Sequence, residues 1–271
     1  MSSKSTPTAE HPFTNGRPPH LPCGPGDIYP DVLLPGDPDR VVLLADQLDD
    51  VQDFGRKREF AVVSGKYRGH PLTICSTGIG GSSTEIALIE LSLLGAKRVI
   101  RVGGMSSLVK EIPTGSFLCV DKATGYSSVA RLYSGVENGL ALADADLHQA
   151  LMSTDLGDDT RIYSGMVGST DSYYFGQDRS VVTSTAQPPK ISYLKELQAR
   201  GAVGVDMECQ TVLSVAASLG LKGACLLGVH GNRATNDWLV DYEPTQRKLL
   251  DIAGTALART SDYHQTAKEK Q

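Results

Sequence analysis

The segment LTICSTGIGGSSTEIALIELSLLGAKRVIRVG, residues 72–103, decides the fold of this 271-residue chain. It opens with a short apolar run, passes through a glycine-rich turn at residues 78–81, and continues into a stretch with helical periodicity at residues 85–94. Gly95 ends that helix, and the apolar run at residues 98–103 follows as a second strand. Strand, helix and strand in this order form a βαβ unit, which builds mostly parallel sheets.

The same alternation extends along the rest of the chain. We expect strands at residues 32–34, 59–64, 72–76, 98–103, 116–120, 163–169, 202–207 and 224–229. We expect helices after residue 38 to about residue 48, and at residues 85–94, 145–153, 191–199, 208–219 and 244–260. The turn-like cluster at residues 65–69 predicts a hairpin between the second and third strands.

The domain organisation is simple, because no linker or internal repeat divides the chain after residue 20. We predict a single α/β domain over residues 20–265 with a central sheet. Residues 1–19, rich in Ser, Thr and Pro, predict a mobile N-terminal tail, and residues 266–271 a short C-terminal tail.

Composition excludes several classes of protein. The net charge of −5 argues against a nucleic-acid partner, and no apolar run reaches the roughly 18 residues of a membrane span. The five cysteines are odd in number, widely spaced and lack a CxxC pair, so we expect buried free thiols rather than disulfides, a metal site or catalysis. Without a secretory signal, these features predict a cytoplasmic protein without membrane partners.

Two glycine-rich turns, at residues 35–40 and 78–81, precede expected helices, where backbone N–H groups favour anions. Neither turn has the Lys-Ser/Thr of a nucleotide triphosphate loop or a strict GxGxxG, and such a turn taken alone is more often plain connecting geometry than a phosphate site.

Seven short motifs occur in order along the chain: PGDPDR at 35–40, REF at 58–60, STGIGG at 76–81, RVIRVG at 98–103, GQDR at 176–179, VDME at 205–208 and GNR at 231–233. Together they resemble the successive signatures of nucleoside phosphorylases of the uridine phosphorylase type, over roughly residues 20–260. The resemblance implies a mixed, partly barrel-like sheet flanked by helices. It also implies phosphorolysis of uridine to uracil and ribose 1-phosphate in pyrimidine salvage, with inorganic phosphate as co-substrate and no other cofactor.

Phosphorolysis requires a bound phosphate, which calls for guanidinium forks and backbone N–H donors. By resemblance, Gly36, Arg40, Arg101 and Gly104 hold it, and Arg58 reaches into the neighbouring subunit's site. A lone arginine is otherwise a solvated surface ion pair. Arg101 fits that reading least, since it interrupts an apolar strand where an unpaired charge is costly.

The sugar requires a carboxylate that accepts bonds from its hydroxyls and stabilises positive charge as the glycosidic bond breaks. Glu208 matches the family's ribose-binding glutamate, with Met207 packed on the sugar; alternatively, Glu208 is a helix N-terminal glutamate favoured by the macrodipole. His20 matches a histidine donated across a dimer to the 5′-hydroxyl, or else it belongs to the tail.

The base site separates pyrimidine from purine enzymes. Gln177 and Arg179 suit uracil, because an amide pairs with a ring N–H and a carbonyl while a guanidinium stabilises the departing anion. Tyr173 stacks on base or sugar where phenylalanine is usual. The purine branch would have aspartate at Asn232. Gln177 and Arg179 are otherwise ordinary surface residues. Arg233 joins Arg101 and Glu208 as a catalytic residue by resemblance.

Four further positions depart from the family pattern. Gly104 stands where threonine usually binds phosphate, and Ser106 offers a replacement hydroxyl if the loop is shifted. Asp206 replaces a glutamate. His230-Gly231 replaces two apolar residues, which implies a more polar or roomier pocket at the uracil 5-position.

The resemblance also implies a homodimer, or a hexamer built from dimers, with a structural monovalent cation in some relatives at positions matching Glu59, Ile79 and Ser83. The alternatives left open are a non-catalytic nucleoside-binding relative, motivated by Gly104, and a phosphorylase or hydrolase for another nucleoside.

Overall fold

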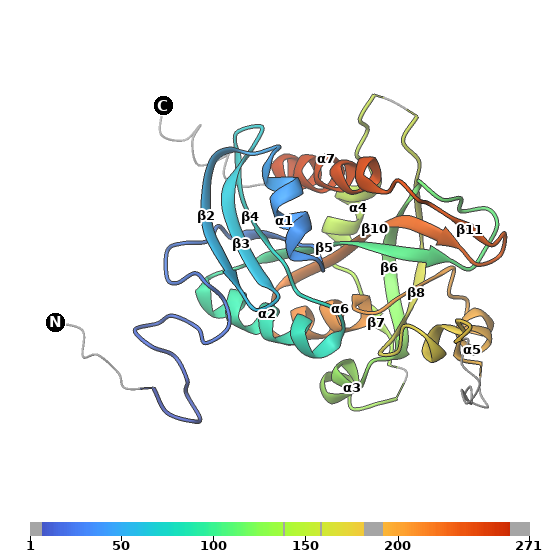
Figure 1. Cartoon of the computed structure of the whole chain (residues 1–271), viewed down its shortest axis with the longest axis horizontal. Coiled ribbons are helices and arrows are strands. Elements are labelled where there is room, and N and C mark those ends of the chain that lie inside the picture. Colours follow the sequence, from blue (N-terminus) through green and yellow to red (C-terminus); the bar gives the residue numbers. More distant parts are fainter. Residues whose placement is uncertain (1–6, 138, 158, 182–191, 261–271) are drawn as a thin grey trace.

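The computed structural model describes residues 7–137, 139–157, 159–181 and 192–260. Its strands belong to one 11-stranded mixed sheet in the order β11-β10-β6-β8-β9-β5-β1-β4-β3-β2, with β7 paired to β6 (Figure 1). The strands are β1 Asp31–Leu34, β2 Asp49–Lys57, β3 Phe60–Tyr67, β4 His70–Cys75, β5 Arg98–Ser107, β6 Phe117–Tyr126, β7 Ala141–Leu142, β8 Ile162–Thr170, β9 Gly204–Asp206, β10 Lys222–Asn232 and β11 Asp237–Trp238.

A ring of five strands forms part of this sheet. β5 pairs with β10, β10 with β6, β6 with β8, β8 with β9, and β9 returns to β5. The sheet therefore closes on itself over this part and leaves β1, β4, β3 and β2 as an open wing. The expected partly barrel-like α/β fold is confirmed.

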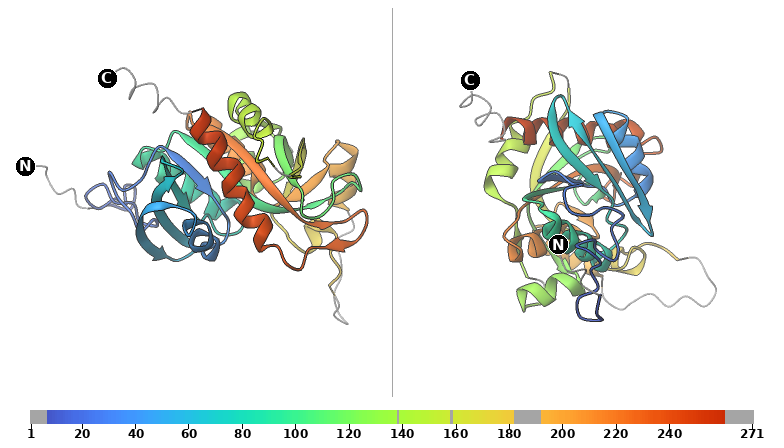
Figure 2. Two further views of the ribbon diagram at one scale, coloured as in Figure 1. Left: turned by 90° about the horizontal axis from the view of Figure 1, so that it is seen from above. Right: turned by 90° about the vertical axis from the view of Figure 1, so that its left-hand side faces the viewer.

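Helices cover both faces of the sheet, as the two views of Figure 2 show. One buried cluster includes Leu88 and Leu91 of α2 with Val212 and Leu213 of α6. A second joins α1, α4 and α7 on the opposite face. The helices are α1 Pro38–Ala45, α2 Gly81–Leu94, α3 Ser128–Ser134, α4 Ala145–Met152, α5 Tyr193–Ala199, α6 Cys209–Ser218 and α7 Glu243–Arg259, with a 3₁₀ turn at Phe175–Gln177.

The expected elements occur close to their predicted bounds. The hairpin is β3 and β4, paired antiparallel, and β4, α2 and β5 form the expected strand–helix–strand unit. The helix expected at residues 191–199 begins at Tyr193, and residue 191 lies outside the described residues. Besides the 3₁₀ turn, four elements were not predicted: β2, whose nine residues are almost all exposed, the short helix α3, and the two-residue strands β7 and β11.

The chain before β1 is irregular over residues 7–30, with one isolated bridge between Thr14 and Arg17. The first six residues and the predicted C-terminal tail lie outside the described residues. All five cysteines are buried with free thiols. Within the described part of the chain, no helix is long and apolar enough to cross a membrane.

The strand directions bring the glycine-rich turns together. β1 runs parallel to β4 and to β5, and β5 runs parallel to β10, so the carboxyl ends of these strands meet at one edge. Just beyond β1 and β4, the Thr77 and Gly78 N–H groups donate to the carbonyls of Pro35 and Gly36, at 2.9 and 2.8 Å. Ligands bind at such an edge in open α/β sheets.

Candidate active site

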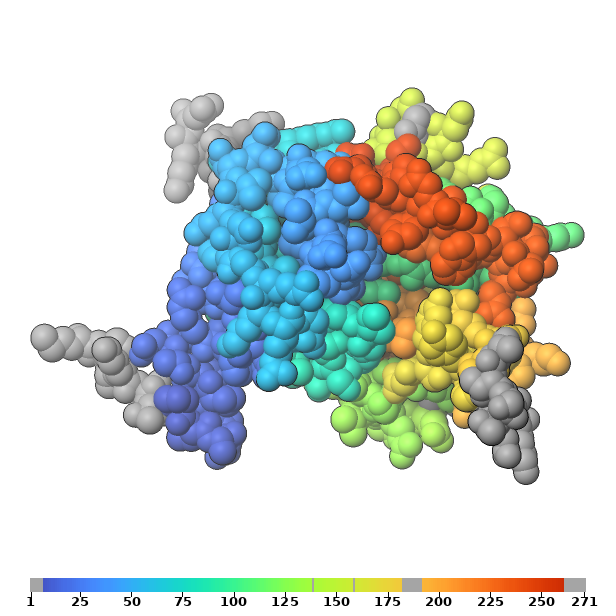
Figure 3. Space-filling model, in the orientation of Figure 1, coloured from blue at the N-terminus to red at the C-terminus, as the bar shows by residue number. Residues whose placement is uncertain are grey.

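A cavity of about 1060 Å³ opens at this edge, and the space-filling view shows the surface hollowed between the N-terminal wing and the C-terminal segments (Figure 3). That volume accommodates a nucleoside-sized ligand together with a small anion. Nine of the predicted binding residues line it: Gly36, Arg40, Arg101, Gly104, Tyr173, Gln177, Arg179, Met207 and Glu208.

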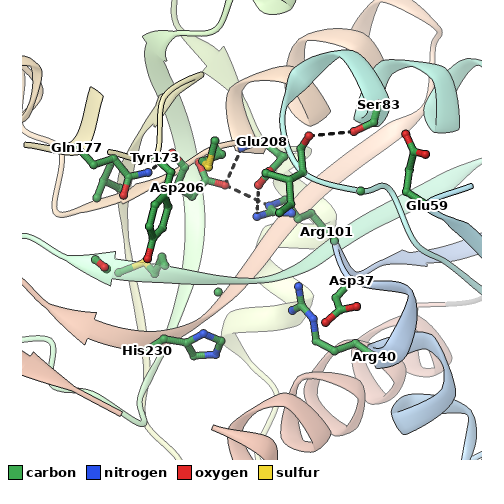
Figure 4. A pocket seen from close by; sticks show the side chains of 18 of the residues that line it. Asp37, Arg40, Glu59, Ser83, Arg101, Tyr173, Gln177, Asp206, Glu208 and His230 are labelled. Atoms are coloured by element: carbon green, nitrogen blue, oxygen red, sulfur yellow. Dashed lines mark hydrogen bonds and ion pairs between the residues drawn. The ribbon is translucent and has the colours of Figure 1, made fainter. Parts of the chain in front are cut away.

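Arg101 of β5 lies on the floor of the cavity, only 4% exposed (Figure 4). Its Nε donates to Asp206 Oδ2 at 3.1 Å and its Nη2 lies 2.5 Å from Glu208 Oε2. Burial disfavours the guanidinium charge, but the Glu208 and Asp206 carboxylates overcome this and raise the pKa of Arg101. Arg101 is therefore not a solvated surface arginine: it anchors a buried charge cluster.

Asp206 is fully engaged by the protein. Besides Arg101, its carboxylate accepts the Ser169 hydroxyl at 2.6 Å and the backbone N–H groups of Glu208 and Cys209 at 3.1 and 2.9 Å. Asp206, although shorter than the glutamate usual in the family, thus caps the first turn of α6 and orients Arg101. The capped turn holds Glu208 in the cavity wall.

Glu208 bridges two elements from the wall of the cavity. Its Oε1 accepts the Gly80 N–H at 2.6 Å, where Gly80 takes φ +89°, a conformation that favours glycine. Burial raises the pKa of Glu208, although the charge of Arg101 opposes the effect. The STGIGG turn therefore orients a carboxylate with a backbone donor.

Arg40 projects from the first turn of α1, whose start is capped by Asp37. Its Nη1 donates to Gln246 Oε1 of α7 at 2.7 Å, and Nη2 lies against Gly36, where an added Cβ would approach it to 3.3 Å. Burial, with the nearby charge of Arg101, lowers the pKa of Arg40 to about 10, so it remains cationic at neutral pH. Two guanidinium groups thus face one end of the cavity.

The other end of the cavity carries amide, guanidinium and aromatic groups. Gln177 is buried, its Nε2 donates to the Asp206 carbonyl at 3.4 Å, and its Oε1 accepts Arg179 Nη2 at 3.3 Å. The Arg179 guanidinium stacks 4.1 Å above the Tyr173 ring, and burial lowers its pKa. The Ser106 hydroxyl accepts a hydrogen bond from Arg179 Nη2 at 3.5 Å. It therefore lies at this end of the cavity, and not beside Arg40, where a replacement for the phosphate-binding threonine hydroxyl was expected.

Arg233 and Asn232 lie behind this end and do not line the cavity. Arg233 donates to the carbonyls of Gln177 and Asp178 at 3.0 and 3.1 Å. Asn232 donates to the carbonyls of Val109 and Ile112 and accepts two backbone N–H groups through its side-chain oxygen. Both side chains hold loops in place in this conformation.

His20 and Arg58 do not line the cavity of their own chain. His20 is held by the buried Glu90 of α2, which accepts the His20 Nδ1 at 2.7 Å and the Leu21 N–H at 2.8 Å. Arg58 is exposed in the turn between β2 and β3, with φ +57°. His20 is thus anchored to the domain.

The three residues expected near a monovalent cation, Glu59, Ile79 and Ser83, all line the mouth of the cavity. Glu59 and Ser83 appear side by side in Figure 4, and Ser83 Oγ donates to the Ile79 carbonyl at 3.1 Å. The described residues contain no cluster of three or more His, Cys, Asp or Glu side chains placed to hold a metal ion.

Sequence reasoning missed the residues that position the site, namely Glu90, Gln246, Tyr242 and Trp238. Glu90 offered a signal, since it is a carboxylate among apolar residues of an expected helix. The others have ordinary local contexts, and only the fold brings Tyr242 and Trp238 to the cavity and Gln246 to Arg40.

The arrangement combines a cationic end, a carboxylate in the middle and an end with polar and aromatic side chains. The family model of the Phosphorylase superfamily matches residues 30–260. The chain is 34% identical over 232 residues to uridine phosphorylase of Thermococcus kodakarensis, covering 85% of this chain and 83% of that protein. It is 31% identical to guanosine phosphorylase of Halorubrum lacusprofundi, covering 79% and 83% of the two chains.

The fold is similar to the crystal structure of uridine phosphorylase from Vibrio fischeri, with a TM-score of 0.74, 27% identity and coverage of 89% of this chain and 97% of that one. The family match spans most of the chain and includes every residue that lines the cavity. The chain belongs to the phosphorylase superfamily.

Proposed function

We propose that this protein catalyses the reversible phosphorolysis of uridine to uracil and ribose 1-phosphate, in pyrimidine salvage. One observation carries the proposal: a single cavity places Arg40 and Arg101 at one end, Glu208 between, and Gln177 with Arg179 at the other. Members of the family use phosphate as co-substrate, and the three groups match phosphate, ribose and uracil in that order.

The reaction makes one bond and breaks another. A phosphate oxygen bonds to C1′ of the ribose while the C1′–N1 bond breaks. The electron pair of the C1′–N1 bond leaves with the uracil. Glu208 stabilises the positive charge that develops on the sugar, with Met207 beside it. Gln177 and Arg179 donate to the uracil carbonyls and stabilise the departing anion. Arg233, through the loop carbonyls it holds, is a positioning residue in this scheme.

The site is completed by a second subunit in our proposal. Arg58 and His20 serve the neighbouring cavity, which requires at least a homodimer with two reciprocal sites, or a hexamer of such dimers. Their absence from their own cavity supports this arrangement. A monovalent cation at Glu59, Ile79 and Ser83 fits the oxygen donors present there. Free buried thiols favour the cytoplasm.

A purine nucleoside is the second candidate substrate, because the guanosine phosphorylase relative is 31% identical. The amide of Gln177 beside a guanidinium favours the uracil edge. Asn232 has an amide in place of an acid for a purine ring nitrogen, and the amide is already hydrogen-bonded to backbone groups.

The test is to incubate the purified protein separately with uridine and guanosine, each with and without inorganic phosphate, and to follow base release. Phosphate-dependent release of uracil, faster than of guanine, is expected. Phosphate-independent release indicates a hydrolase, faster guanine release a purine enzyme, and uridine binding without release a non-catalytic relative; each contradicts the proposal. Arg40→Met should lose activity, whereas Arg131→Met, at an exposed arginine paired with Glu137, is the matched control.

A further inference from the structure

His230 is the one titratable side chain of β10 that faces the cavity, and it lies at an irregularity in the strand. β10 pairs with β5 in register up to Val229 and Met105, but Gly231 then pairs with Ser106, so His230 is an extra residue in a β-bulge. Bulges next to active sites re-aim side chains. In Figure 4 the imidazole lies on the side of Arg40, away from Gln177.

The ring is fixed by two neighbours. It stacks on Tyr242, with 5.1 Å between ring centres and 30° between planes. Its Nε2 makes a short hydrogen bond with Gln246 Nε2. The Gln246 oxygen already accepts Arg40 Nη1 at 2.7 Å, which sets the orientation of the amide. The amide nitrogen can only donate, so His230 Nε2 must be the acceptor.

This chain of bonds determines the tautomer of the imidazole. A neutral ring that accepts at Nε2 carries its proton at Nδ1. Burial, with the charge of Arg40, lowers the pKa of His230 to about 4, which keeps the ring neutral at physiological pH. Among the described residues, none forms a hydrogen bond with His230 Nδ1. The Arg40–Gln246–His230 chain therefore leaves one N–H donor unused at the cavity wall.

Gly104 makes room for that donor. An added Cβ at Gly104 would lie 2.5 Å from His230 Nδ1 and 2.6 Å from the adjacent ring carbon, closer than any side chain tolerates. The imidazole thus occupies the space beside β5 that a residue larger than glycine would fill. Gly104 and His230 are therefore a matched pair, because the imidazole nitrogen lies in the space that a side chain on residue 104 would enter.

We propose that His230 is a phosphate-binding residue, whose Nδ1–H donates to a phosphate oxygen held by Arg40 and the Gly104 N–H. The identity of the anion rests on the proposed phosphorolysis, whereas the direction of the N–H rests on the Arg40–Gln246–His230 chain alone. Gln246 acts as the positioning residue that keeps the proton on Nδ1.

The tautomer is tested by NMR on protein labelled with ¹⁵N-histidine, with the His230 signals assigned from a His230→Leu spectrum. We expect a protonated Nδ1 and an unprotonated Nε2, and a shift of the Nδ1 signal on addition of inorganic phosphate. In Gln246→Leu the proton should distribute over both nitrogens. A proton on Nε2 in the native protein would overturn the proposal.

Binding is tested by steady-state kinetics and by calorimetric titration with inorganic phosphate. A hydrogen bond to an ionised group implies that His230→Leu raises the phosphate KM and Kd about ten- to a hundredfold, with the nucleoside KM little changed. His230→Asn, whose amide nitrogen replaces Nδ1, should recover part of the loss. A higher nucleoside KM with an unchanged phosphate KM would assign His230 to the base and refute the proposal.

The pairing with Gly104 gives a second test. Gly104→Thr alone should displace the ring and weaken phosphate binding, whereas Gly104→Thr with His230→Ala should bind phosphate more tightly than Gly104→Thr. If the effects of the two substitutions on the phosphate Kd were simply additive, residue 104 and the imidazole would not compete for the same space, and the pairing would be refuted. Should the protein act on guanosine instead of uridine, the proposed substrate fails while these phosphate effects remain; a native protein that binds no phosphate refutes the His230 assignment itself.

Discussion

Replacing Arg101 by methionine separates its structural role from its role toward phosphate. Arg101→Met removes the guanidinium from a cluster in which the Asp206 and Glu208 side chains are almost fully buried. Removing one partner of a buried ion pair typically costs about 3–5 kcal/mol, because the remaining charges lose compensation. Methionine fills much of the volume, so the loss is mainly electrostatic.

The corresponding change in melting temperature follows from the chain length. At about 2.1 cal/mol/K per residue, 271 residues give an unfolding entropy of about 0.6 kcal/mol/K. A loss of 3–5 kcal/mol then lowers the Tm by about 5–9 °C at pH 7. The loss should shrink toward pH 5, because the orphaned carboxylates take up protons more readily than the paired ones.

Arg40→Met is the matched control for this measurement. Arg40 faces the same cavity but donates to a neutral amide, Gln246, so its loss should cost only about 0.5–1.5 kcal/mol. Both variants should lose phosphorolysis, whereas only Arg101→Met should melt several degrees lower, at equal protein concentration. Adding Glu208→Gln to Arg101→Met should restore part of the stability, which a double-mutant cycle measures. Equal melting temperatures for the two arginine variants would refute the buried-charge argument.

Three further outcomes are expected. Gln177→Leu should raise the uridine KM about tenfold or more with little effect on the phosphate KM, since its amide lies at the far end of the cavity; unchanged selectivity between uridine and guanosine would show that Gln177 does not read the base. Mixing inactive His20→Ala and Arg40→Met subunits after reversible dissociation should restore about a quarter of native activity, because each mixed dimer has one intact site; no recovery would exclude a shared site. Because the pKa of His230 is lowered to about 4, the unfolded chain binds a proton between pH 6.5 and 4 that the folded chain does not, so stability falls as the pH drops through this window. The loss from pH 7 to pH 5 is about 2 kcal/mol, and thermal melts of His230→Asn should show a correspondingly flatter pH dependence.

Much of the fold was predictable because buried strands leave short apolar runs. β4, α2 and β5 follow from the 72–103 segment alone, since each has its own periodicity and the glycines mark its ends. β2 was not predictable, because it is exposed on both faces and shows no alternation. The pairing of β5 with β10 joins segments more than 100 residues apart, and local patterns do not report such a contact.

That a residue lines the cavity was predictable where it belongs to a short motif, as for Arg40, Arg101 and Glu208. It was not predictable where a residue acts through a distant partner. No sequence pattern around Gln246 in α7 predicts that its side chain accepts a hydrogen bond from Arg40 of α1. The bulge at His230 shifts the register by one residue, and that shift, rather than the identity of the residue alone, turns the imidazole beside Gly104.

The five-strand ring has a consequence for how the protein folds. β5 pairs with three strands, β1, β10 and β9, and two of these lie about a hundred residues or more further along the chain. During synthesis β5 has β1 as a partner early, but its other edge stays open until β10 leaves the ribosome. An open apolar edge favours association with other chains, so we expect slow folding and aggregation of fragments that end before β10. Because Arg101 lies on β5 and Glu208 follows β9, the closing of the ring also assembles the charge cluster of the site.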